Sequence, residues 1–307
     1  MFANEKIDIR SRLGFIGLGY LGSRIAGRLQ NAGFPMVVYD VVQSRAMEFS
    51  KEGAEIALSP SELASKADVV LSCLPDERAV EAVYFGKDSV FRYARPCTRI
   101  IELSTVSLGT ARRLHSLAQQ FDLDALDVTV SGSTPTAEAG ALTLFGGGDR
   151  DVFESAESIF AAIARQWFYM GPGGSGVAMK LVVNTLLGVG MQAIAEAVAL
   201  GERLDLPREV LFDVLSKTAV VAPAHAGKLA TAIGHNYEPQ FPVRLMRKDF
   251  GLILAAAADL HLSMPATEAA AVINDIEASS GIEEDFSAVI RRMEQDGRLG
   301  NMPPSVQ

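Results

Sequence analysis

The chain has 307 residues, of which 49% are hydrophobic and 21% are charged. This length allows two domains, and the composition is that of a globular chain rather than a disordered one. The formal net charge of −9 argues against nucleic acid or a membrane surface as a partner, because both reward clustered Lys and Arg. Cys73 and Cys97 are the only cysteines, too few for a disulfide framework and without metal-ligand spacing.

The start of the chain, MFANEKIDIRSR, mixes charges of both signs and contains no apolar stretch. A secretory signal needs such a stretch behind a basic beginning. We therefore expect no secretory signal and a cytoplasmic protein.

A glycine-rich motif follows the first expected strand, residues 13–16, and opens a helix expected to run through residue 31. The motif reads Gly17, Leu18, Gly19, Tyr20, Leu21, Gly22. This is the G-x-G-x-x-G pattern between a strand and a helix, and a second strand is expected over 36–39. The pattern predicts dinucleotide binding, with the pyrophosphate at the N-terminus of the helix.

Asp40 ends the second expected strand. An acidic residue there accepts hydrogen bonds from the adenosine ribose and repels a 2′-phosphate, which favours NAD over NADP. Arg45 lies just beyond and offers the alternative of a 2′-phosphate contact. A solvent-exposed position on a helix is the more ordinary interpretation of that arginine.

Strands and helices continue to alternate along the first half of the chain. Further strands are expected over 68–73, 100–103, 125–130, 141–145 and 167–169, and helices over 60–67, 78–84, 108–121 and 151–165. Repeated units of this kind predict an open, mostly parallel, doubly wound sheet with helices on both faces. Ligands of such sheets lie beyond the carboxyl ends of the strands.

Three strand ends carry residues suited to ligand contacts. They are Leu74 and Pro75, then Ser104 and Thr105, and then Ser131, Gly132 and Ser133. Hydroxyl residues at such places are often only turn formers or helix caps, an interpretation that covers Ser107. The third group offers hydroxyls and open backbone N–H groups in one loop, which suits a small carboxylate.

A long apolar helix is expected after the glycine-rich turn that begins at Gly171. It carries Lys180 and, four residues later on the same face, Asn184. A membrane span is the alternative. However, the helix carries polar residues spaced by multiples of four, namely Lys180, Asn184, Gln192 and Glu196, which would be costly in a bilayer. We instead expect a core helix whose desolvated lysine has a lowered pKa and exchanges protons near neutral pH.

Only helices are expected beyond it, over 207–217, 243–260, 265–278 and 286–295. The sequence thus predicts a Rossmann domain over 1–172 and an all-α domain over 173–307, joined by the long helix. Alanine-rich helices there suggest close packing and a subunit interface, hence a homodimer or homotetramer. Lys248, in a charged cluster with Arg247 and Asp249, is either solvent-exposed or placed to reach a cofactor or substrate anion. No pattern of the four histidines suggests a metal.

Four segments together resemble one family. GFIGLGYLGSRIAGRLQNAG, DVTVSGSTPTAEAGALTLFGGG, GPGGSGVAMKLVVN and FPVRLMRKD occur in the order and spacing of the β-hydroxyacid dehydrogenases, the group of 3-hydroxyisobutyrate dehydrogenase and tartronate semialdehyde reductase. The resemblance implies a Rossmann domain, a helical domain and the reversible NAD(P)-dependent oxidation of a 3-hydroxy acid to its semialdehyde. It also implies site residues: Lys180 as the catalytic lysine, Asn184 as its partner, Ser131 and Gly132 as the substrate loop, and Lys248 near cofactor and substrate.

Two positions depart from the family pattern. Ser133 replaces the second glycine of the substrate loop, and Val183 replaces the first of a usual pair of asparagines. Both departures bear on the identity of the substrate more than on the chemistry. The retained Lys180 argues against the imine reductases, which usually replace that lysine. Two rivals remain: a reductase of another small carbonyl or imine, such as glyoxylate or succinic semialdehyde, and a Rossmann module that binds cofactor without catalysis.

Overall fold

Within residues 6–299, the part of the chain that the computed structural model describes, eight strands form a single sheet. The strands are β1 (Leu13–Ile16), β2 (Met36–Tyr39), β3 (Glu55–Ile56), β4 (Val69–Ser72), β5 (Arg99–Glu102), β6 (Asp124–Ser131), β7 (Leu142–Gly148) and β8 (Ala164–Gly171). Their order is β3-β2-β1-β4-β5-β6-β7-β8. All neighbours are parallel except β6 and β7. The predicted doubly wound, mostly parallel sheet is therefore confirmed.

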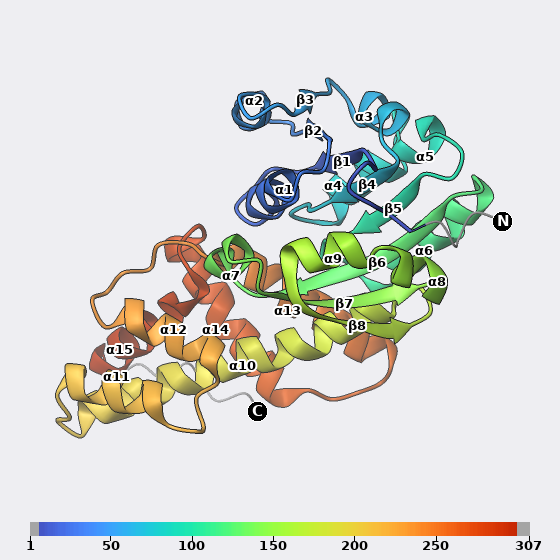
Figure 1. Ribbon diagram of the computed structural model, residues 1–307. Coiled ribbons are helices and arrows are strands. Elements are labelled where there is room, and N and C mark those ends of the chain that lie inside the picture. The colour runs from blue at the N-terminus through green and yellow to red at the C-terminus, as the bar shows by residue number, and fades with distance from the viewer. Residues whose placement is uncertain (1–5, 300–307) are drawn as a thin grey trace. The chain divides into compact units, whose positions relative to one another are not determined.

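Helices pack around this sheet (Figure 1). They are α1 (Gly22–Asn31), α2 (Gln43–Ser50), α3 (Pro60–Lys66), α4 (Glu77–Tyr84), α5 (Val90–Tyr93), α6 (Leu108–Gln120), α7 (Thr134–Glu138), α8 (Arg150–Ser155) and α9 (Glu157–Ile163). β1 and β4 are buried along their whole length, as parallel strands covered on both faces must be. Ser59 caps α3 and Ser107 caps α6, each accepting a backbone N–H through its side chain.

The helix predicted over 151–165 is not continuous and ends earlier than expected. The chain instead forms α8 and α9, which meet at Ala156, and enters β8 already at Ala164. The Ser155 hydroxyl donates to the Val152 carbonyl oxygen at 2.6 Å, a local bond that competes with a continuous helix. The glycines 146–148 also belong to β7, because their lack of side chains lets Phe153 and the start of the next long helix pack against the strand.

The chain divides into a unit that ends at Lys180 and a unit that begins at Leu181. The long helix α10 (Ser175–Arg203) runs through this point. The boundary predicted at 172/173 stays a prediction. The domain limits given from residue 1 and to residue 307 fall outside the described residues.

The second unit is helical, as predicted. After α10 come α11 (Arg208–Lys217), α12 (Pro223–Ala232), α13 (Val243–Asp259), α14 (Pro265–Gly281), the 3-10 turn η1 (Phe286–Ala288) and α15 (Val289–Leu299). α12 is not among the helices expected from the sequence. Its buried face includes His225 and Lys228, and Lys228 forms an ion pair of 2.6 Å with the buried Asp285. Because Leu229 and Ala232 are the only apolar members of that face, the apolar periodicity of α12 is weak.

α10 is long and apolar enough to cross a membrane, with a mean hydropathy of 1.6 over its most apolar window. Its polar residues argue for a different role, because Asn184 and Gln192 are both buried in the protein. Met191, Ala195 and Val198 of the same helix belong to the core of the second unit. α10 thus contributes to a packed helical core, as expected.

Candidate active site

Six parallel strands, β1 to β6, bring their carboxyl ends to one edge of the sheet. β1 lies between β2 and β4, so the order of the strands reverses there. Such a switch point is where open α/β sheets bind their ligands. The predicted site residues of the loops after β1, β2, β4 and β5 lie at this edge, and so does the end of β6 at Ser131.

The turn between β1 and α1 is shaped by its glycines. Gly17 has a φ of +93°, and a Cβ added to it would lie 2.4 Å from the carbonyl oxygen of Cys73. A Cβ added to Gly22 would lie 2.0 Å from the carbonyl oxygen of Gly17. By contrast, a Cβ at Gly19 would meet nothing within 4 Å. Gly17 and Gly22 are therefore required by the fold, whereas Gly19 borders open space.

The same turn fits the pyrophosphate of a dinucleotide. No side chain caps the N-terminus of α1, so the positive end of its dipole is open to an anion. The backbone at Gly19 offers the close approach that such a group needs. Leu18 is buried, Leu21 packs against the core, and Tyr20 is exposed. These three residues contribute to the turn mainly through their backbone.

Asp40 is fixed at the end of β2. One carboxylate oxygen accepts the N–H of Leu18 at 2.6 Å and the other accepts the N–H of Val42 at 2.7 Å. The carboxylate is therefore tied to the glycine-rich turn itself. A guanidinium nitrogen of Arg45 lies 3.5 Å from Asp40, and the arginine side chain is half exposed. Arg45 is thus close enough to respond to any change at Asp40.

A buried network joins the loops after β4 and β5. Leu74, half-buried, donates its N–H to the Ser104 hydroxyl at 2.7 Å, and the N–H of Ser104 donates to the Glu102 carboxylate at 2.7 Å. Ser72 donates to the other oxygen of Glu102. Pro75 is exposed and Thr105 is half-buried at this edge. Glu102, which is not among the site residues predicted from the sequence, therefore links both loops predicted to contact the cofactor.

Burial raises the pKa of Glu102 to about 7, and hydrogen bonds from Ser104, Ser72 and Tyr84 offset only part of that effect. Between the ordinary pKa of 4.5 and about 7, the folded protein holds a proton that the unfolded chain releases. Glu102 thus stabilises the fold fully below pH 4.5, and this contribution is lost as the pH rises to about 7. The loss amounts to roughly 3 kcal/mol.

We expect Glu102→Gln to remove the decrease in folding stability between pH 4.5 and about 7, because glutamine does not ionise. Urea unfolding between pH 4.5 and 7, followed by the fluorescence of Trp167, would measure it, because Trp167 is the only tryptophan and lies in β8. Glu48→Gln, at an exposed position on α2, should keep the wild-type pH dependence. Equal pH slopes in the wild type and in Glu102→Gln would contradict the prediction.

The Ser131 loop lies at the end of β6. Gly132 has a φ of +145°, and a Cβ there would lie 2.7 Å from the side chain of Leu142, so a glycine is needed. Ser133 has a φ of −97° and precedes α7, with its hydroxyl 3.2 Å from that of Thr136. Its backbone conformation suits any residue, so the replacement of the usual glycine by Ser133 causes no backbone strain.

Lys180 and Asn184 are both buried, at 8% and 0% exposure, and lie one turn apart on α10. In the second unit, Asn184 donates through its amide nitrogen to the Asp249 carboxylate at 2.5 Å. Its amide oxygen is buried and has no hydrogen-bond partner among the described residues. An unpaired buried acceptor is costly in a folded protein, which suggests that a ligand supplies its partner.

Asp249 is buried, at 1% exposure, and was not predicted as a site residue, although it belongs to the charged cluster with Lys248. Its neighbours behave differently: Arg247 pairs with Asp275 at the surface, and Lys248 lies 3.2 Å from Asp249. The sequence did contain a signal. Asp249 occurs on the apolar face of α13 that also carries Met246 and Ile253, where an acidic residue needs a partner. The predicted role of Lys248 towards cofactor and substrate stays a prediction.

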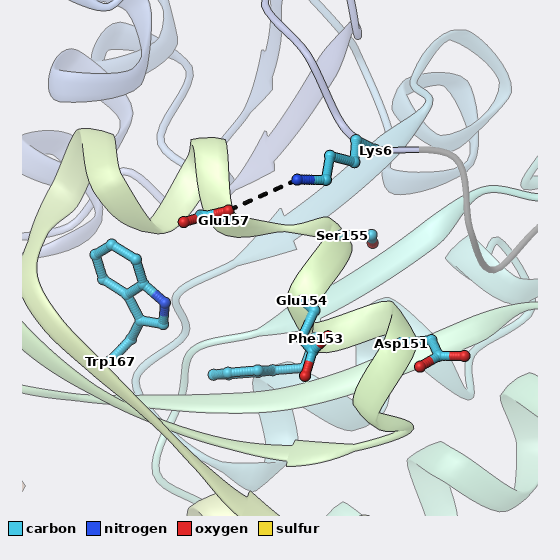
Figure 2. Close-up of a pocket in the computed structure, with 7 residues that line it drawn as sticks. All are labelled: Lys6, Asp151, Phe153, Glu154, Ser155, Glu157 and Trp167. Atoms are coloured by element: carbon cyan, nitrogen blue, oxygen red, sulfur yellow. Dashed lines mark ion pairs between the residues drawn. The ribbon is translucent and has the colours of Figure 1, made fainter.

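A surface cavity of roughly 380 Å³ lies elsewhere in the first unit (Figure 2). Its lining includes Lys6, which lies 4.0 Å from Glu157, and the edge strand residue Trp167. Lys6 precedes β1, and α8 follows β7, so the cavity borders the amino ends of the parallel strands and not the predicted site. Among the described residues, no group of three or more His, Cys, Asp or Glu could hold a metal ion.

Two family models match the chain. Residues 12–171 match the NAD binding domain of 6-phosphogluconate dehydrogenase, and residues 174–293 match the model described as NAD-binding of NADP-dependent 3-hydroxyisobutyrate dehydrogenase. Together with the glycine-rich turn, these matches define an NAD(P)-binding dehydrogenase of the Rossmann type.

Individual relatives are similar along nearly the whole chain. The NAD-dependent L-serine dehydrogenase of Pseudomonas aeruginosa is 35% identical over 286 residues, 91% of this chain and 96% of that protein. Glyoxylate/succinic semialdehyde reductase 1 of Arabidopsis thaliana is 32% identical over 279 residues, again 91% and 96%. A solved structure of 3-hydroxyisobutyrate dehydrogenase from Mycobacterium tuberculosis with L-serine is 31% identical, with a TM-score of 0.84 over 92% of this chain and 99% of that one. The chain belongs to the β-hydroxyacid dehydrogenase family, which confirms the resemblance drawn from its motifs.

Proposed function

We propose that this chain catalyses the reversible NAD(P)-dependent oxidation of a small 3-hydroxy acid to its semialdehyde, with Lys180 as the general acid/base. The observation that carries this proposal is a buried lysine in the first turns of α10, one turn before an asparagine whose amide oxygen has no partner among the described residues. The dehydrogenases and reductases among the relatives support the reaction class. A small carboxylate is the substrate class that these relatives suggest.

The glycine-rich turn and Asp40 would hold the NAD(P) cofactor, which when bound would supply or accept the hydride, so the protein's own residues handle the proton. In the oxidising direction, neutral Lys180 removes the proton of the substrate hydroxyl, and in the reducing direction its ammonium returns that proton to the carbonyl oxygen. The amide oxygen of Asn184 accepts a hydrogen bond from the substrate hydroxyl or from the Lys180 ammonium. The Ser131 hydroxyl and the Gly132 N–H hold the substrate carboxylate.

NAD is the preferred cofactor in this proposal, because the Asp40 carboxylate accepts ribose hydroxyls and repels a 2′-phosphate. We expect Asp40→Ser to lower kcat/KM for NAD by about 10–100-fold, since a charge-assisted hydrogen bond contributes roughly 1.5–3 kcal/mol. The same change should raise kcat/KM for NADP, because Arg45 loses its neighbouring carboxylate. Initial rates with both cofactors measure the effect.

Arg45 provides the control for the cofactor prediction. Adding Arg45→Gln to Asp40→Ser should remove the gain with NADP and leave the loss with NAD unchanged. A wild-type protein that already prefers NADPH would overturn the assigned role of Asp40 without affecting Lys180.

The test of the function is an initial-rate assay at ~340 nm with NADH and NADPH. Short semialdehydes are the substrates in one direction, and 3-hydroxy acids, including L-serine, in the other. Turnover of a semialdehyde that disappears in Lys180→Ala supports the proposal. Turnover confined to glyoxylate or an imine would favour the second candidate, a reductase of another small carbonyl, which the Arabidopsis relative makes worth testing. Binding of both cofactors without any turnover would favour a non-catalytic module.

We also propose that the protein is a soluble cytoplasmic homodimer or homotetramer. α10 exposes several large apolar side chains, namely Val182, Leu186 and Leu200, which are 58%, 71% and 61% exposed. A second copy of the chain covering these residues would account for an apolar helix that is otherwise open to water.

A further inference from the structure

The glycine-rich turn before α10 is held by a carboxylate from the middle of the sheet. Asp127, on β6, accepts the N–H of Gly174 at 2.8 Å with one oxygen and the N–H of Val177 at 2.9 Å with the other. The first of these oxygens also lies 2.8 Å from Nε2 of His115, on α6. Asp127 is 2% exposed, so this set of contacts is buried. The first N–H groups of a helix lack partners within the helix, and a carboxylate satisfies them and complements the dipole.

The glycines of this turn are explained by the same contacts. A Cβ at Gly176 would lie 2.2 Å from the backbone oxygen of Asp127. A Cβ at Gly173 would lie 2.5 Å from the imidazole of His115, and one at Gly147 would lie 2.6 Å from the Asp127 carboxylate. Side chains at these positions would force helix, histidine and strand apart. The turn is thus built for a close approach of α10 to β6.

The close packing of α10 on β6 also fixes which side of the helix faces the strand. Thr129, two residues after Asp127 and on the same face of β6, donates its hydroxyl to the carbonyl oxygen of Gly176 at 2.8 Å. Lys180 follows Gly176 by one turn and therefore lies on the same side of the helix. Ser131 follows Thr129 by two residues and shares its face of the strand. One strand thus holds the start of the lysine helix and ends in the predicted substrate loop.

We propose that Asp127, steadied by His115, is a positioning residue that fixes Lys180 relative to the substrate loop at Ser131. This inference rests on the proposed role of Lys180 as the acid/base. Asp127 touches neither substrate nor cofactor in this account. It acts through the first turn of α10, because a shift of that turn moves the lysine ammonium relative to the carbon that exchanges the hydride.

The main test is Asp127→Asn in the full-length protein. The amide keeps the size of the side chain but has one acceptor oxygen, so it cannot bind both N–H groups. A misplacement of about 1 Å can lower the rate 10²-fold, and we expect kcat to fall roughly 10–100-fold while KM and Kd for NADH stay within about twofold. With 4-deuterated NADH, the primary isotope effect on kcat should be at least as large as in the wild type, because the chemical step is the one slowed.

Variants of His115 keep the test valid if Asp127→Asn does not fold. His115→Ala should lower kcat about 2–10-fold, as expected for the loss of one hydrogen bond. His115→Gln should restore at least half of that loss, since its amide nitrogen can donate in place of Nε2. Asp124→Asn, at the start of the same strand, is the matched control and should leave kcat unchanged.

The outcomes separate this inference from the proposed function. If Lys180→Ala is inactive but Asp127→Asn and His115→Ala have wild-type kcat, the inference is wrong and the proposed function stands. A parallel rise of the NADH Kd in the Asp127 variant would indicate general loosening of the first unit and would also overturn it. Undiminished turnover in Lys180→Ala would instead refute the proposed role of Lys180, and with it this inference, whatever Asp127 does.

Discussion

Lys180→Ala should lower kcat by about 10²–10⁴-fold, the usual effect of removing a general acid/base. Without the amine, no other described residue of the first turns of α10 can exchange the proton of the reacting hydroxyl, since its neighbours from Val177 to Val183 are otherwise apolar. Binding of NADH should stay within about twofold of the wild-type value, because the glycine-rich turn is untouched. Steady-state kinetics and a fluorescence titration with NADH measure the two quantities.

Two controls, a second substitution and rescue by an added amine, make the lysine experiment specific. Lys180→Met keeps most of the length of the side chain in its buried position and removes its charge, so it should fold as well as the wild type and be as inactive as Lys180→Ala. Added methylamine should restore part of the turnover of Lys180→Ala, because it supplies the missing amine in the space left by the side chain. A variant with kcat within about twofold of the wild type would show that another group handles the proton.

Gly19→Val should strongly weaken binding of NAD(H) without destabilising the protein. A Cβ at Gly19 meets nothing within 4 Å, so valine fits the free protein, but it would occupy the space where the pyrophosphate approaches the backbone. We expect the Kd of NADH to rise by about 10²-fold or more, while the midpoint of thermal unfolding changes little. Isothermal titration and thermal unfolding measure the two effects.

Gly27 supplies a matched control for the glycine experiment. It lies in α1, where an added Cβ also meets nothing within 4 Å, but outside the turn. Gly27→Val should leave NADH binding unchanged and stabilise the helix slightly, because glycine is a poorer helix former than valine. Unaltered NADH binding in Gly19→Val would contradict the assignment of the turn to the pyrophosphate.

The sequence predicts best what neighbouring residues determine. β1 and β2 lie where expected, over Leu13–Ile16 and Met36–Tyr39, because a glycine pattern and an acidic strand end frame them. α12 was not predicted because its inner face carries the charged Lys228. The partner of that charge, Asp285, is 57 residues away in the sequence. The roles of Asp127 and Asp249 were not predicted for the same reason. Their hydrogen-bond partners, Val177 and Asn184, are 50 and 65 residues away in the sequence. The apolar face of α13 marks Asp249 as a carboxylate that needs a partner, but the sequence alone does not identify the residue that supplies it.

The hydrogen bond between Asn184 and Asp249 affects how well the alcohol and the aldehyde form of the substrate would bind. A carboxylate only accepts hydrogen bonds, so it must face the amide nitrogen of Asn184, and the oxygen is the atom left over. An alcohol or an ammonium group has a proton to offer that oxygen, whereas an aldehyde has none. Where this oxygen accepts its hydrogen bond from the substrate hydroxyl and not from the Lys180 ammonium, oxidation of the alcohol would leave two oxygens facing each other without a proton between them. The asparagine would then favour the alcohol over the aldehyde and promote departure of the oxidised product.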